Sequence, residues 1–175
     1  MSRLDRFLDG DLSLSKEVDK AYGKQTNKYQ KSSFLITLNP NISYLSLDTK
    51  AQRVSLYKRL VEYIEDVKEG LDFYNSSSDY SFVKMLKNNK ICINPLQDFQ
   101  YAIEIGKKKG YIHVHMLAVF KCPIHINQAK LRAFSNEIRD DGEKVHLNIK
   151  YIHNPLNSVL GYISKDKGVI DSGSV

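Results

Sequence analysis

The sequence predicts an α+β fold, in which an antiparallel sheet carries helices on one side and leaves a working surface on the other. Strand-like and helical patterns follow one another in the order strand, helix, strand, strand, helix, strand, helix between residues 33 and 167. A short basic turn joins two of the strands directly, which predicts an antiparallel hairpin. With 175 residues, 42% of them hydrophobic, the chain is long enough for one buried core and predicts a single main domain.

The first strand is predicted at residues 33–38, where apolar side chains alternate and the sequence Asn-Pro-Asn then stops the strand. The longest helix is predicted at residues 48–69, with Asp48 as its N-terminal cap and Gly70 at its end. Apolar residues recur through it at helical spacing, at Val54, Tyr57, Leu60, Val61, Ile64 and Val67. Residues 75–89 begin with a serine-rich turn and then indicate a short helix.

Two strands are predicted at residues 99–105 and 111–120, on either side of the sequence Gly-Lys-Lys-Lys-Gly. If Gly106 pairs with Tyr111 around a four-residue turn, Glu104 lies directly opposite His113 on the same face of the sheet. A shift of the register by one residue would move Glu104 to the other face, because successive side chains point to opposite faces.

The second half of the chain continues with a helix at residues 128–139, capped by Asn127, and a strand at residues 144–151. One side of that helix is apolar, at Leu131, Phe134 and Ile138. A short helix is then predicted at residues 157–167. Tyr162 and Lys165 share its polar face, because they are three residues apart.

The composition bounds the domain organisation and the partners. Residues 1–31 are polar and predict a loosely packed extension, 32–170 form the main domain, and 171–175 a flexible tail. An excess of 26 Lys and Arg over 20 Asp and Glu favours a polyanionic partner. The two cysteines are isolated, and no stretch has the length of a signal peptide core or a membrane span. A reducing cytoplasm or nucleus is therefore expected, without secretion.

Two histidines interrupt the otherwise apolar strand at residues 111–120. Side chains at i and i+2 leave a strand on the same face, so His113 and His115 can hold one metal ion together with Glu104. Three protein ligands leave positions open for water or a substrate oxygen, which a catalytic metal site requires. Phosphoryl chemistry favours Mg or Mn among the metals that such a site accepts. The alternative is a sheet face on which the histidines only form hydrogen bonds.

Tyr162 is the candidate nucleophile. A free phenol has a pKa of about 10, so its attack requires help from a metal, a base or a nearby cation. Lys165 lies one helical turn away and can supply that cation. The positions one turn around Tyr162 hold no second tyrosine, which predicts a mechanism with a single tyrosine.

Three segments in this order resemble the motifs of HUH endonucleases of the replication-initiator (Rep) type: Phe34 to Asn39, Glu104 with His113-Val114-His115, and Tyr162 to Lys165. The chain is most similar to Rep proteins of circular single-stranded DNA viruses and rolling-circle plasmids, over residues 33–168. The resemblance implies an antiparallel sheet of about five strands with flanking helices, in a ferredoxin-like or RRM-like arrangement. It also implies a metal-dependent, sequence-specific nickase that joins strands and initiates rolling-circle replication.

Carried over residue by residue, the resemblance makes His113, His115 and Glu104 the metal ligands, Tyr162 the nucleophile and Lys165 the motif lysine. It implies that the tyrosine cleaves single-stranded DNA to leave a 5′-phosphotyrosine and a free 3′-hydroxyl. Contacts to DNA are expected from polar and basic side chains, at Lys107, Lys108, Lys109, His146, Lys150 and Asn39.

The expected partner is single-stranded DNA at a replication origin, linked covalently through the tyrosine, with no membrane partner. The resemblance also implies a helicase domain or helicase protein that this chain does not contain. The expected location is the host nucleus for a virus of a eukaryote, and otherwise the cytoplasm. A single-tyrosine HUH transposase and a non-enzymatic DNA-binding module are the alternatives. A cupin-like metal oxygenase also pairs two histidines on strands, but the helices at residues 48–69 and 127–139 argue against so purely β a fold.

Overall fold

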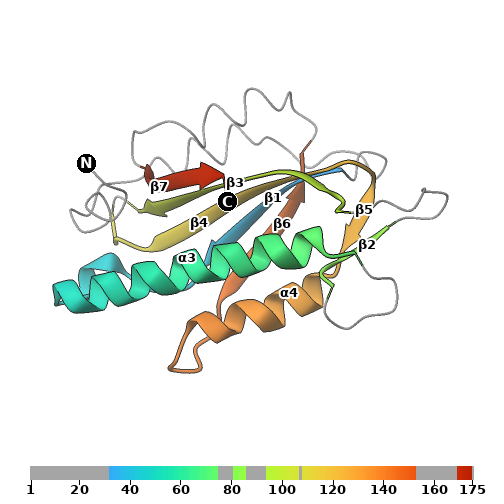
Figure 1. Cartoon of the computed structure of the whole chain (residues 1–175). Helices are drawn as coiled ribbons and strands as arrows, with labels where there is room; N and C mark the ends of the chain where they lie inside the picture. Colours follow the sequence, from blue (N-terminus) through green and yellow to red (C-terminus); the bar gives the residue numbers. More distant parts are fainter. Residues whose placement is uncertain (1–31, 75–80, 86–93, 107, 153–168, 175) are drawn as a thin grey trace.

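The computed structural model describes residues 32–74, 81–85, 94–106 and 108–152, together with the backbone of residues 169–174. Its main sheet is antiparallel and has the strand order β6-β1-β4-β3-β7 (Figure 1). The strands are β1 (Ser33–Asn39), β3 (Leu96–Ile105), β4 (Ile112–Phe120), β6 (His146–Tyr151) and β7 (Val169–Ser174). The predicted α+β class, with a central antiparallel sheet, is therefore confirmed.

Two helices, α3 (Lys50–Asp72) and α4 (Gln128–Ser135), cover one face of this sheet (Figure 1). Short 3-10 turns follow β1 and α4, namely η1 (Tyr44–Ser46) and η2 (Asn136–Ile138). The helix predicted at residues 128–139 is confirmed as α4 and η2, and the Asn127 side chain caps it by accepting a hydrogen bond from the Lys130 N–H.

Both predicted ends of the long helix are wrong. Its N-terminal cap is Thr49 rather than Asp48, because Thr49 and Gln52 exchange side-chain-to-backbone hydrogen bonds in a capping box. The helix also continues through Gly70 to end at Asp72. Gly70 is required there for another reason, since a Cβ atom at this position would overlap the ring of Phe82.

The core lies between α3, α4 and the sheet. The buried side of α3 is formed by Leu56, Leu60, Tyr63, Ile64, Val67 and Leu71. Val54, Tyr57 and Val61, which the sequence places on the same stripe, are only partly buried. The periodicity therefore identifies the helix correctly, but packing against the sheet decides which edge of its apolar stripe is central.

Two further segments differ from the expectation. In the described part of residues 75–89, Val83–Met85 forms strand β2 instead of a helix and pairs with β5 (Ile124–Ile126). That partner is distant in the sequence, so local patterns give no sign of it. At the C-terminus, residues predicted to be a flexible tail belong to β7, whose backbone pairs with β3.

The second face of the main sheet is the one that carries polar residues. Phe34, Ile36 and Leu38 of β1 belong to the core, so the alternate residues of β1 point away from the helices. In β4, Val114 and Met116 lie in the same core, which turns His113 and His115 to the second face. The functional surface that the sequence predicts opposite the helices is therefore the face of the sheet that carries His113 and His115, which is named the histidine face below.

Candidate functional site

The β3–β4 hairpin has the register that the sequence predicts. The Gly106 N–H donates to the Tyr111 carbonyl at 2.8 Å, and Glu104 pairs directly with His113. The turn closes through Gly110, whose φ of 66° lies in the left-handed region that glycine tolerates. Because the register is fixed by this turn, Glu104 and both histidines share one face of the sheet.

Glu104 and His115 form a buried polar pair. Glu104 Oε2 lies 3.1 Å from His115 Nε2, and the two side chains are 0% and 1% exposed. His115 pairs in register with Ala102, so its contact with Glu104 runs diagonally between the strands. The small side chain of Ala102 leaves the room that this diagonal requires.

The second carboxylate oxygen of Glu104 is buried and has no hydrogen-bond partner among the residues that the structure describes. Leaving a buried acceptor unsatisfied costs about 1–3 kcal/mol. Packing does not offset this cost, because a fully buried carboxylate gains less from burial than an apolar side chain of similar size would. A buried, incompletely paired carboxylate beside a histidine is therefore a candidate functional group.

Thr37 completes the contacts of the His115 ring. The two residues are register partners on β1 and β4, and Thr37 Oγ1 lies 3.2 Å from His115 Nδ1. On its other side, Thr37 pairs with Asn148 of β6. The sequence analysis did not identify Thr37 as a site residue. A threonine at an alternating position of an apolar strand is a signal, but its partner lies 78 residues away.

The spacing of Glu104 and His115 decides whether the two side chains can bind the same metal ion. Among the described residues, no three or more His, Cys, Asp or Glu side chains are grouped so that they could hold one. However, the 3.1 Å between Nε2 and Oε2 is close to the separation of about 3.0–3.5 Å between neighbouring ligands of an ion at about 2.0–2.2 Å. The unpaired Oε1 adds a further oxygen donor. Glu104 and His115 are therefore spaced like two neighbouring ligands of one metal ion. His113, on the same face, is the predicted third ligand.

The predicted DNA-contacting residues are partly placed by the structure. Lys108 and Lys109 are exposed on the hairpin turn, and the Ser43 hydroxyl anchors this turn by donating to the Lys109 carbonyl at 2.6 Å. Exposed His146 pairs with Asn39, and partly buried Lys150 pairs with Leu35.

The β1–β6 register puts the three predicted contacts on these strands, Asn39, His146 and Lys150, on the histidine face. Three further predicted site residues, Lys107, Tyr162 and Lys165, lie outside the described residues. The helix predicted at residues 157–167 and the extension at residues 1–31 lie outside them as well.

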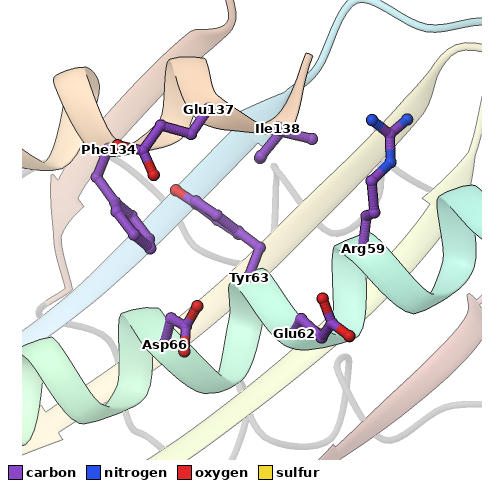
Figure 2. Close-up of a pocket in the computed structure, with 7 residues that line it drawn as sticks. All are labelled: Arg59, Glu62, Tyr63, Asp66, Phe134, Glu137 and Ile138. Carbon is purple, nitrogen blue, oxygen red and sulfur yellow. The ribbon is translucent and has the colours of Figure 1, made fainter. Parts of the chain in front are cut away.

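A pocket of about 190 Å³ lies on the opposite side of the sheet, between α3 and the end of α4 (Figure 2). Carboxylates dominate its charged lining, which consists of Arg59, Glu62, Asp66 and Glu137. The guanidinium of Arg59 is already paired with Asp140 at 2.7 Å. Tyr63 stacks on Phe134 there, with ring centroids 5.1 Å apart, and burial raises the pKa of its phenol. This acidic lining repels phosphate, so the pocket does not suit a nucleic acid.

Comparison with models of known protein families gives no match, and comparison with curated proteins gives no significant similarity. No helix in the described ranges is long and apolar enough to cross a bilayer. Any function proposed for this chain must therefore be supported by its own residues and their geometry.

Proposed function

We propose that this protein is a metal-dependent, sequence-specific single-stranded DNA endonuclease and strand-joining enzyme, of the HUH type that initiates rolling-circle replication. The observation that carries the proposal is the buried Glu104, which lies opposite His113 and 3.1 Å from His115 Nε2. The resemblance to the HUH family assigns the metal ligands to these three residues. The antiparallel sheet with helices on one face also agrees with the ferredoxin-like HUH fold, which is part of the proposal.

His113, His115 and Glu104 would hold the metal ion. A bound Mg or Mn would polarise the scissile phosphate and stabilise the charge that develops on it. The phenol oxygen of Tyr162 would then form a bond to phosphorus while the bond from phosphorus to the 3′ oxygen breaks. The products are a 5′-phosphotyrosine and a free 3′-hydroxyl, and the reverse attack by this hydroxyl would join strands. The ammonium of Lys165 would favour the phenolate of Tyr162 by lowering its pKa.

The test is to incubate the protein with a single-stranded DNA library and Mn, and to map any covalent peptide-DNA adduct. We expect an adduct on Tyr162 that is lost in Tyr162→Phe and in His115→Ala. Tyr111→Phe is the matched control, because Tyr111 is an exposed tyrosine at the start of the hairpin's second strand and should leave the adduct unchanged. An adduct that still forms with Tyr162→Phe would overturn the proposal.

A second candidate is a DNA-binding module without catalytic activity. It is favoured by the direct contact between Glu104 and His115, since Thr37, His115 and Glu104 form a continuous hydrogen-bonded row without a metal ion. Such a module would bind single-stranded DNA equally well in Mn and in EDTA, with no cleavage. The proposed enzyme would form the Tyr162 adduct with Mn and lose it with EDTA.

A further inference from the structure

Both nitrogens of the His115 ring have a side-chain partner. Nδ1 faces the Thr37 hydroxyl at 3.2 Å, and Nε2 faces Glu104 Oε2 at 3.1 Å. We propose that Thr37 is the positioning residue of His115: its hydroxyl holds the ring in place and supports whichever tautomer the ring adopts. The consequence for metal binding rests on the proposed function, whereas the contact of Thr37 with the ring does not.

The geometry makes Thr37 a rigid support. β1 lies inside the sheet between β6 and β4, so its backbone is held by hydrogen bonds on both sides. Thr37 is also β-branched, which restricts the rotation of its side chain about χ1. Since the contact joins register partners, the position of the hydroxyl relative to the ring is set by the pairing of β1 with β4.

A hydroxyl suits this position because it can both donate and accept a hydrogen bond. When the ring proton is on Nε2, that N–H donates to Glu104 and the Thr37 O–H donates to Nδ1. Nε2 can act as a metal ligand only when the ring proton is on Nδ1, and Thr37 Oγ1 then accepts from it. The ring carries one proton and is neutral in both states, so only the hydroxyl has to turn. A carbonyl at this position could accept from a protonated Nδ1 but could not donate to an unprotonated one, and a methyl group could do neither.

The first test compares Thr37→Val, which keeps the shape and removes the hydroxyl, with Thr37→Ser, which keeps the hydroxyl. Mn affinity is measured by calorimetry, and urea unfolding shows that each variant is folded. We expect Thr37→Val to lower Mn affinity by about 10–100-fold, the usual effect of losing the hydrogen-bond partner of a ligating histidine. Thr37→Ser should stay close to wild type. Ser33→Ala removes a hydroxyl from the same face of the same strand and is the matched control.

The second test reads the ring directly in metal-free protein, by the ¹⁵N NMR resonances of His115. Nδ1 should show the shift of a hydrogen-bonded acceptor in wild type and in Thr37→Ser, and that of an unbonded nitrogen in Thr37→Val. Identical Nδ1 resonances in wild type and Thr37→Val would overturn the proposal.

The two tests separate failure of this inference from failure of the proposed function. If Thr37→Val binds Mn as tightly as wild type while His115→Ala does not bind it, the metal site stands and the role of Thr37 is refuted. If wild-type protein does not bind Mn at all, the proposed metal site fails. The NMR comparison then decides by itself whether Thr37 positions the ring.

Discussion

Replacing Glu104 and His115 by leucine, singly and together, tests two points about this buried pair. The first is whether the effects of the two replacements on the free energy of unfolding are coupled. The second is whether the pair as a whole contributes to stability. Both side chains are buried, and their face of the sheet also carries the buried apolar residues Leu35 and Leu117. Leucine at both positions would therefore extend an apolar patch. Thr37 would lose its ring contact, but this residue is partly exposed, so water can reach its hydroxyl.

The expected magnitudes follow from the contacts. His115→Leu removes the hydrogen-bond partner of a buried carboxylate and should destabilise the fold by about 3–5 kcal/mol. Glu104→Leu leaves the Nε2–H of a buried imidazole without its acceptor, which should cost about 1–3 kcal/mol. If the effects of the two single replacements were additive, the double variant would be destabilised by about 4–8 kcal/mol. Replacing a whole buried pair by apolar side chains, however, often leaves the stability of the fold unchanged or raises it. The double variant should therefore be about as stable as wild type, with a coupling energy of at least about 4 kcal/mol.

The assay is urea unfolding of all four proteins, with equal m values as the condition for comparing midpoints. In thermal unfolding of the same proteins, at about 2–4 °C per kcal/mol for a chain of this size, the double variant and an additive outcome differ by at least about 8 °C in Tm. The double variant should also form no adduct with DNA. A double variant as unstable as the sum of its single variants would refute the coupling and the view that the pair is kept for function.

Thr49→Ala should lower the free energy of unfolding by about 1 kcal/mol because it removes the capping box, while Asp48→Ala should change it by less than about 0.5 kcal/mol; urea midpoints check both values. Gly70→Ala should destabilise by about 1–3 kcal/mol despite a better helix propensity, because the new Cβ would overlap a buried phenylalanine ring, and an unchanged Tm would contradict this. A hydrogen bond from Arg139 lowers the pKa of Asp141 to about 2, so the stability from ionised Asp141 is present above about pH 4 and is lost as the pH falls through about 2. The difference in urea midpoint between wild type and Asp141→Asn should accordingly shrink from pH 4 to pH 2, and a constant difference would refute the assignment.

The local part of the site could be predicted from the sequence, because it depends on hydrogen bonds between residues close along the chain. Strand alternation and the turn at residues 106–110 were sufficient to place Glu104 opposite His113. The cap at Asn127 follows from the same kind of local rule. The cap of α3 shows the limit of such rules, since neighbouring Asp48 and Thr49 are both good caps and the reciprocal contact with Gln52 decides between them.

The sequence alone thus determined the class of fold, the hairpin register and the face shared by Glu104 and the two histidines. Only the tertiary structure decided that Thr37 supports the His115 ring, that Glu104 is completely buried, and that β2 pairs with β5. The physical reason is the range of the interactions involved. Periodicity and turn chemistry act over a few residues, whereas the pairing of β1 with β4 brings together Thr37 and His115, which are 78 positions apart, and is selected by the packing of the whole core.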